Sequence, residues 1–453
     1  MGISDTLVKI SQYLPEITKP EKEITFKNKL LWTALALVIF FVLGKIALIG
    51  VDVAAGYGQN LGFAQVILAS QMGTLITAGI GPIVMASIFL QLLLGAKLLN
   101  IELGSPEGRA KFQALQKILT VILCFVEGAV YVNPNMLVPF GGATPFNPWY
   151  WLVILQIAAG SIALLYLDEI VSKYGIGSGV SLFIAAGVSG ELLWRVFLPP
   201  ILPNVTSSGL LWATLTTGDI GYMFPFFAAI GILLIVTFAE GMHVNIPITM
   251  GHRGTGGRYP VKFLYVSNMP VILAMALFAT LQLWATFLSN IPIIGTLANG
   301  LKWAVSMPNV GGMSIVQAIY YQGLNSITLA ALAQGIMFLG ILVVACIIFG
   351  WFWVQMGNQS TSAVAAQLER AGMQIPGFRR DKRVIEKVLS RYIPPITILG
   401  SIFVALLAGM GDFVLSGIAS GTGILLTVGI VYRFYEEIAK SQADMLSSFL
   451  GKL

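Results

Sequence analysis

Apolar stretches of about 20 residues recur along the entire chain, and they constrain its fold more than any other feature. Each is long enough to cross a hydrocarbon core of about 30 Å as a helix. Of the 453 residues, 57% are hydrophobic and 10% are charged, whereas a soluble domain carries about 25% charged residues. Barrel strands would be shorter and would alternate polar with apolar residues, which these stretches do not. The sequence therefore predicts an all-α, polytopic membrane protein.

Hydropathy predicts ten transmembrane helices. They lie near 30–50, 74–96, 115–132, 149–167, 175–194, 222–241, 263–284, 332–354, 393–411 and 417–438. An even number of spans puts both termini on one side. All but three of the 26 basic residues fall on that same side, the exceptions being Lys45, Arg195 and Lys302. The positive-inside rule then makes both termini cytoplasmic, in a multi-pass protein of the cell (plasma) membrane.

The chain divides into two halves of five helices. We expect a cytoplasmic segment at 1–29, an amino-terminal half at 30–195, a proline-rich external hinge at 196–220, a carboxyl-terminal half at 221–438 with cytoplasmic loops at 242–262 and 355–392, and a cytoplasmic tail at 439–453. Because five is odd, a structural repeat between the halves would be inverted in the membrane.

The first segment carries apolar residues at helical spacing, which predicts an amphipathic helix; they are Ile3, Leu7, Ile10, Leu14 and Ile17. This helix lies either on the membrane surface or against the protein's own loops.

The stretch between the first and second spans is apolar but interrupted by glycines, with Pro82 behind them. Glycine and proline weaken a helix, so we expect a short segment near 59–70, a break, and then a full helix. Irregular backbone at membrane depth must be enclosed by protein or line a cavity. One interpretation is a movable element inside a pore, and the other is a plain external loop.

Signatures of covalent chemistry are missing from the sequence, so we expect no enzyme, no cofactor and no metal site. His243 and His252 lack carboxylate or cysteine partners at metal spacing, and there is no phosphate-binding loop. Glu127, Asp168, Glu169, Glu240 and Asp412 fall near predicted helix ends, where we expect water or headgroups to solvate them. Ion-coupled carriers place such groups near the midplane. A pore fits better than the alternative, a secondary transporter with inverted repeats.

Several strings, in order from the second to the tenth span, resemble one family, the SecY/Sec61α translocon channel in its archaeal and eukaryotic-like branch. They are GIGPIV (79–84), YLDEIVSKYGIGSGV (166–180), RYPVKFLYVSNMPVIL (258–273), PGFRR (376–380), RYIPP (391–395) and GTGILLTVGIVYRFYE (421–436).

The resemblance implies a passive protein-conducting channel of two five-helix halves around an hourglass pore. Its waist would be a ring of aliphatic side chains, Ile80, Val84, Ile176, Val180, Ile272 and Leu426. The two i,i+4 pairs, Ile80/Val84 and Ile176/Val180, would each point along one helix face. A short plug helix before the second span would close the pore; its residues would include Tyr57, Gly58, Leu61, Phe63, Val66 and Ser70.

The resemblance also implies a lateral gate between spans 2–3 and 7–8, lined by Met85, Ser87, Ser267 and Asn268. Relatives often have a serine or threonine where this chain has Met85, which weakens a polar pairing with Asn268.

Partners follow from the same resemblance. The ribosome would dock on the 6–7 and 8–9 loops through Arg253, Arg258, Arg379, Arg380, Arg383 and Arg391, since arginine suits phosphate-rich RNA. Small subunits similar to SecE/Sec61γ and Secβ/Sec61β would clamp the halves. Unfolded preproteins would cross the pore, and signal sequences would leave it sideways into the lipid bilayer.

Overall fold

Ten long helices make up the body of the protein over the residues that the structure describes. The computed structural model describes residues 15–18, 20, 24–52, 65, 68–95, 98–99, 101, 105–197, 209–250, 256–289, 294–308, 315–323, 328–357, 359–370, 373–374, 382–415 and 421–450. The first five helices are α2 (Phe26–Leu43), α4 (Gly81–Gly95), α5 (Pro106–Tyr131), α6 (Pro148–Tyr174) and α7 (Gly179–Phe197). The second five are α9 (Phe224–Gly241), α10 (Met269–Leu288), α13 (Leu329–Met356), α16 (Ile393–Leu415) and α17 (Gly421–Leu450).

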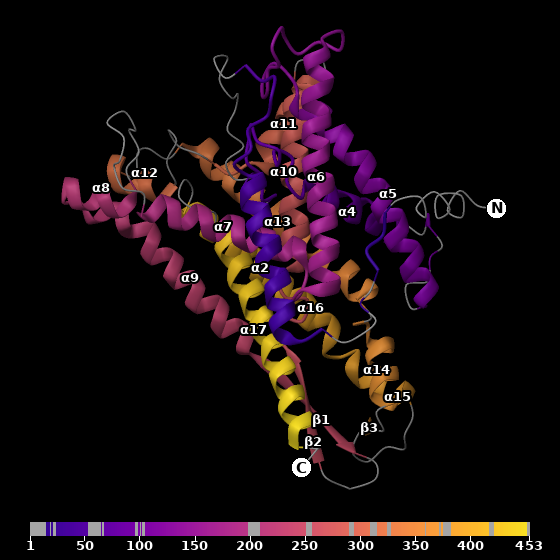
Figure 1. The fold of residues 1–453 in the computed structure, drawn as a ribbon. Coiled ribbons are helices and arrows are strands. Elements are labelled where there is room, and N and C mark those ends of the chain that lie inside the picture. Colours follow the sequence, from indigo (N-terminus) through magenta and orange to yellow (C-terminus); the bar gives the residue numbers. More distant parts are fainter. Residues whose placement is uncertain are drawn as a thin grey trace.

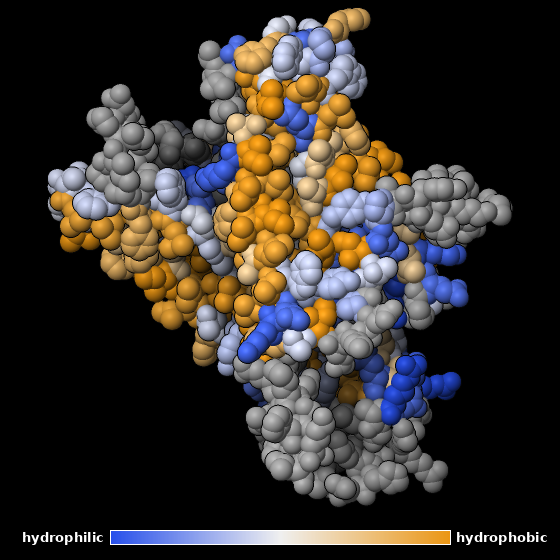
Figure 2. Space-filling model, viewed as in Figure 1, coloured by the Kyte–Doolittle hydropathy of each residue, from blue (hydrophilic) through white to orange (hydrophobic). Residues whose placement is uncertain are grey.

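The outer faces of these helices are apolar and exposed, as a lipid-facing surface must be. On α2, Val38 is 62% exposed, and on α9, Phe238 is 73% exposed. Figure 2 shows the apolar surface along the middle of the molecule, with hydrophilic residues gathered toward its ends. Within the described residues, eight helices are long and apolar enough to cross a membrane; α4, at 15 residues, is shorter but apolar. The predicted multi-pass helical fold is confirmed.

The two halves repeat one pattern of helix contacts. In the first half, α2 packs against α6 and α7, α4 against α5, α5 against α6, and α6 against α7. In the second, α9 packs against α16 and α17, α10 against α13, α13 against α16, and α16 against α17. Each five-helix half is thus the structural counterpart of the other, and the odd number makes the repeat inverted. The halves meet at two seams, where α4 and α5 contact α10 and where α7 contacts α17.

A small domain of sheet and helix projects from one end of the bundle, at the bottom of Figure 1. Strands β1 (His243–Met250), β2 (Gly256–Lys262) and β3 (Met373–Gln374) form an antiparallel sheet in the order β2-β1-β3. Helices α14 (Thr361–Arg370) and α15 (Lys382–Leu389) share a separate apolar core with it, which includes Ile246, Val261, Leu368 and Ile385. We call this end of the molecule the sheet side.

The sheet corrects the prediction that the 6–7 segment is a loop, and α14 and α15 form helices within the predicted 8–9 loop at 355–392. Because Ile246 pairs with Tyr259 and Val244 with Val261, the two segments form a ladder that also joins the 8–9 segment through β3.

Short helices cover the end of the bundle opposite the sheet, which we call the far side (Figure 1). They are α8 (Leu210–Thr217), η2 (Ile220–Met223), α11 (Ile294–Val305) and α12 (Ile315–Gln322). They lie between long helices that the sequence joined by loops. The α8 helix falls in the predicted hinge at 196–220, so that connection is partly helical.

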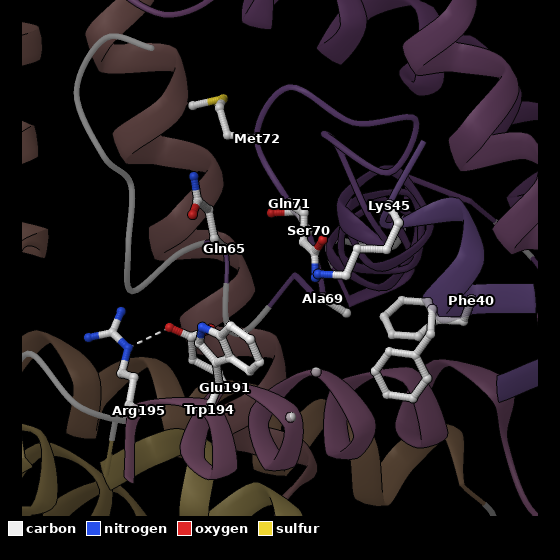
Figure 3. Close-up of a pocket in the computed structure, with 13 residues that line it drawn as sticks. Phe40, Lys45, Gln65, Ala69, Ser70, Gln71, Met72, Glu191, Trp194 and Arg195 are labelled. Carbon is white, nitrogen blue, oxygen red and sulfur yellow. Dashed lines mark hydrogen bonds and ion pairs between the residues drawn. The ribbon is translucent and has the colours of Figure 1, made fainter. Parts of the chain in front are cut away.

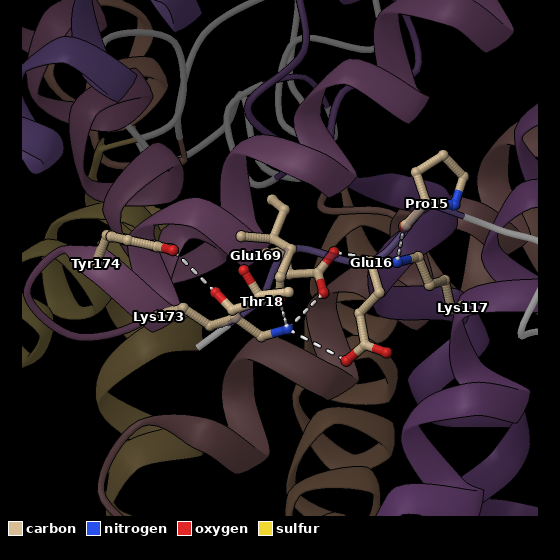
Figure 4. A network of polar contacts seen from close by, with 8 residues as sticks. Pro15, Glu16, Thr18, Lys117, Glu169, Lys173 and Tyr174 are labelled. Carbon is tan, nitrogen blue, oxygen red and sulfur yellow. Dashed lines mark hydrogen bonds and ion pairs between the residues drawn. The ribbon is translucent and has the colours of Figure 1, made fainter. Parts of the chain in front are cut away.

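The segment before α2 is held by side chains of α5 and α6 (Figure 4). Lys117 donates to the carbonyl of Pro15 at 2.6 Å, Lys173 donates to that of Ile17, and the Tyr174 hydroxyl donates to that of Thr18 at 2.9 Å. Glu169 accepts from both lysines, at 3.1 and 2.8 Å. Residues 15–18 therefore pack on the protein itself; the predicted amphipathic helix lies mostly outside the described residues.

Replacing Glu169 with glutamine should loosen this attachment. The variant removes the negative charge shared by Lys117 and Lys173, and charge-assisted hydrogen bonds contribute about 1.5–3 kcal/mol each. We expect trypsin to cleave before α2 about tenfold faster, since about 1.4 kcal/mol of local stability corresponds to a factor of ten. Glu107→Gln, at the exposed start of α5, is the control and should leave the rate within about threefold. Equal rates for both variants would show that the network does not hold the segment.

Candidate functional site

One face of α7 runs from apolar to charged along the length of the helix. Val180, Ile184, Gly187, Glu191 and Arg195 follow one another at steps of four, three, four and four, so they share that face. Its far end lines a cavity of about 480 Å³ on the side away from the sheet. In Figure 3, Glu191 and Arg195 of α7 form an ion pair on one side of this far-side cavity, and Phe40 and Lys45 lie on the other.

A matching face of α17 carries Leu426, Ile430, Arg433 and Glu437. The last three line a second cavity, of about 420 Å³, together with Ser178 and Ser181 from the beginning of α7. This sheet-side cavity lies on the α7–α17 seam, between the two halves.

Buried aliphatic side chains separate the two cavities along these faces. Ile80, Ile184 and Leu426 are at most 1% exposed, and Val84 and Ile272 are at most 6% exposed. All five belong to one apolar cluster, and Val180 packs against it. They come from α7 and α17, which form one seam, and from α10 and the start of α4, which form the other. We call this set of six residues the waist.

Ile176 does not belong to the waist, which corrects the predicted ring. It lies in the bend between α6 and α7, where its N–H donates to the Thr33 hydroxyl at 3.0 Å, and it lines a small hollow with Phe26 and Glu437. Since α7 begins only at Gly179, the residue one turn beyond Val180 on the same face is Ile184. Hydropathy starts this helix at Gly175, one turn too early, and the family resemblance, which implies the ring residues, pairs Ile176 with Val180 and does not include Ile184.

A short segment that precedes α4 lies against the waist from the far side. The N–H of Ile80 donates to the carbonyl of Leu68 at 2.9 Å. Ala69 packs on Gly187, where an added Cβ would lie 3.6 Å from the Ala69 Cα. Ser70 is 7% exposed. Gly79 has φ +57°, and a side chain there would collide with the Leu68 carbonyl.

Ser70 is thus the one predicted plug residue within the described part of the chain. Tyr57, Gly58, Leu61, Phe63 and Val66 lie outside it.

Two of the four residues predicted for the gate lie on α4. Met85 is buried in α4, and Ser87 accepts from Gln91 at 3.0 Å. At the end of α4, Gly95 packs against the ring of Phe352 in α13, so α4 also touches the second half there.

Ser267 and Asn268 make their described contacts inside the second half. The Ser267 hydroxyl donates to Glu240 of α9 at 3.0 Å, and the Asn268 side chain donates to the Leu425 carbonyl of α17 at 3.0 Å. Neither contact reaches α4, so a polar pairing across the seam is not among the described interactions. The sequence does not predict this hydrogen bond, by which the Asn268 side chain links α10 to α17 next to Leu426.

Replacing Gly429 with alanine should disrupt the hydrogen bond between Asn268 and Leu425. An added Cβ would overlap the Asn268 side-chain nitrogen, so Asn268 must leave the Leu425 carbonyl. Overpacking of this kind costs about 1–3 kcal/mol, and we expect a clear fall in the thermal unfolding temperature. Gly340→Ala is a matched control, because nothing lies within 4 Å of its added Cβ. Asn268→Ala should partly rescue Gly429→Ala; a variant as stable as wild type would contradict this packing.

The basic residues predicted for docking are only partly described. Arg383 on α15 and Arg391 just after it are exposed on the sheet side. Arg258 is part of β2, whereas Arg253, Arg379 and Arg380 lie outside the described residues.

Three acidic residues are buried in the protein, which corrects the expectation that water reaches them. Glu127, Glu240 and Asp412 are at most 3% exposed. Asp412 accepts from the N–H of Thr422 at 3.0 Å and from its hydroxyl. Within the described residues, no group of three His, Cys, Asp or Glu side chains could hold a metal ion.

Comparison with known proteins finds, along nearly the whole chain, the family resemblance that the sequence motifs suggest. Residues 74–435 match the SecY family model. The chain is 42% identical to the protein translocase subunit SecY of Methanocaldococcus jannaschii, with 99% of both chains covered, and 39% identical to that of Pyrococcus furiosus, with 100% of this chain and 99% of the relative covered.

Among solved structures, one described as a protein-conducting channel matches with a TM-score of 0.82 at 41% identity, covering 99% of this chain and 100% of that one. Canine Sec61 in a ribosome–channel complex from the endoplasmic reticulum matches with a TM-score of 0.80 at 41% identity, with the same coverage.

Proposed function

This chain belongs to the SecY family, and from that premise we propose that it is the central channel subunit of a protein translocase, a passive pore for unfolded polypeptides. The observation that carries the proposal is the pair of cavities on the α7 and α17 faces, with the buried waist between them. A polypeptide that followed these faces would cross from one end of the bundle to the other between the halves.

The waist would act as a seal that yields to a chain in transit. Ile80, Val84, Val180, Ile184, Ile272 and Leu426 are aliphatic. Apolar constrictions exclude ions by dewetting and bind no solute. Aliphatic side chains also adapt to any residue that passes. The segment Leu68–Ser70, as the end of a plug spanning about 57–70, would close the waist from the far side.

The two seams suggest different roles. The α7–α17 seam would act as the hinge, and the seam of α4 and α5 with α10 would open sideways to release signal and transmembrane segments into lipid. Met85, Ser87, Ser267 and Asn268 would set how hydrophobic a segment must be to leave. Because the main described contacts between the halves, near 30–195 and 221–438, lie at these seams, small subunits similar to SecE and Secβ would hold them together.

The sheet side would be cytoplasmic, with both termini on it, in the cell membrane. The positive-inside bias of the sequence supports this orientation. No covalent step is proposed for the chain, and the partner on the sheet side, the ribosome in the simplest case, would supply the driving force.

The test is transport itself. The chain would be reconstituted in vesicles with its small subunits and supplied with ribosomes carrying a secretory polypeptide. We expect the polypeptide to become resistant to added protease unless detergent is present. A secondary transporter would instead accumulate a small solute along an ion gradient and leave the polypeptide exposed.

Reversing the charge of the sheet-side arginines should weaken ribosome docking. Arg383 and Arg391 are exposed on one surface, and for each RNA phosphate that an arginine no longer neutralises, the slope of log affinity against log salt falls by about one. We expect Arg383→Glu with Arg391→Glu to weaken binding at least about tenfold at physiological salt. The control is Lys302→Glu on the far side, which should bind normally. Equal ribosome binding by both variants would mean that these arginines set the orientation of the protein in the membrane and do not contact the ribosome.

A further inference from the structure

Glu127 of α5 lies beside the waist and the segment that closes it. A Cβ added to Gly81 would lie 2.8 Å from the Glu127 Oε2 and 3.6 Å from the Leu68 Cδ1. The carboxyl, the first residue of α4 and Leu68 therefore meet at one point. Glu127 is 1% exposed, and neither of its oxygens has a hydrogen-bond partner among the described residues.

The other buried acids in the bundle differ from Glu127. Asp412 is bonded to Thr422, and Glu240 accepts from Ser267. The titratable groups near Glu127 are Cys124 and Tyr131 of the same helix, and no basic side chain contacts it in the described part of the chain. A buried polar group without a partner is unfavourable, so Glu127 contributes nothing to the closed structure that would explain a carboxyl at this position.

We propose that Glu127 is a selectivity residue of the open pore: when Leu68–Ser70 leaves the waist, its carboxylate becomes exposed to water there and favours monovalent cations over anions. The inference rests on the proposed function, since it needs a pore and a closing segment that moves.

The position of Glu127 gives its charge more influence than other charges on the path. The waist side chains are aliphatic, and the other carboxylate described beside them, that of Asp168, accepts from the N–H of Val180 at 2.8 Å, whereas Glu127 has no described partner. Lys45, Glu191 and Arg195 lie in the far-side cavity, where Glu191 and Arg195 are paired with each other, and Arg433 and Glu437 lie in the sheet-side cavity. Charges facing open water are screened over about 8 Å at physiological salt, whereas a charge in a narrow, low-dielectric passage acts on every ion that crosses.

The first test measures selectivity in planar bilayers with the channel complex lacking residues 57–70, in unequal potassium chloride on the two sides. We expect a reversal potential shifted toward that of potassium. Glu127→Gln should remove the shift, and Glu127→Asp should keep most of it. Glu107→Gln, the same change at the exposed start of α5, should keep all of it. An unchanged potassium preference in Glu127→Gln would overturn the proposal.

The second test measures exposure and does not depend on conduction. Cys124 and Cys346 are buried and free; both would be replaced by alanine and Glu127 by cysteine, in the chain with and without residues 57–70. We expect a charged methanethiosulfonate to modify the new thiol at least about tenfold faster when the segment is absent. Equal rates would overturn the proposal, even if the channel conducts. A silent deletion variant whose thiol is modified faster would instead count against the plug, and not against the exposure of Glu127.

Discussion

Deleting residues 57–70 is expected to turn a silent channel into one with flickering, ion-permeable openings. The deletion removes the hydrogen bond from the Ile80 N–H to the Leu68 carbonyl and the packing of Ala69 on Gly187. Only the aliphatic waist then separates the two cavities, and an apolar constriction without support wets intermittently. Planar-bilayer recording of the reconstituted complex measures the change.

A control changes the sequence of a connection that makes no described contact with the waist residues. Replacing residues 324–327, between α12 and α13 in the sequence, by glycine and serine should leave the channel silent. If the deletion of 57–70 is as silent as this control, the segment does not seal the pore.

Replacing Ile184 with asparagine is expected to have the second-largest effect, because it puts a hydrogen-bonding group into the layer that excludes water. Ile184 is 1% exposed and lies one turn from Val180 on the face of α7 that joins the two cavities. Burying an amide without a partner costs about 1–3 kcal/mol in proteins, and water entering the waist offsets that cost. We therefore expect ion leakage even with residues 57–70 in place.

Ile176→Asn is the discriminating control for Ile184→Asn. Ile176 lies in the bend before α7 and contacts Thr33 through its backbone, so its substitution should leave the channel silent. Leakage from Ile176→Asn, with none from Ile184→Asn, would mean that Ile176 lines the waist, as the family resemblance implies, and that Ile184 does not.

The long helices could be predicted because lipid imposes a length and a composition that are local in sequence. The two cavities could not, since they depend on how α7 meets α2 at one end of the bundle and α17 at the other. The start of α7 shows the limit: Gly175 and Gly177 stand in an apolar stretch that hydropathy does not divide, and the helix begins only at Gly179, where Asp168 accepts from the N–H of Val180 at 2.8 Å.

The remaining differences arise from contacts distant in sequence. The alternation in HVNIPITM is typical of a strand, but its partner strand contains glycine and proline, and its core is supplied by α14 and α15. Glu127 sits near a helix end in the sequence, and its burial depends on Leu68 and Gly81 from elsewhere. Asn268 likewise finds its partner in α17, 157 residues away.

The most direct measurement of the central claim is a site-specific crosslink to a polypeptide arrested during transport. A photoreactive amino acid would replace Leu426 in the waist or, as a control, Val431, which is 55% exposed on another face of the same helix. If the chain passes between the halves, the arrested polypeptide crosslinks to position 426 and not to position 431. Crosslinking at neither position, or at 431 alone, would mean that the polypeptide does not cross this waist.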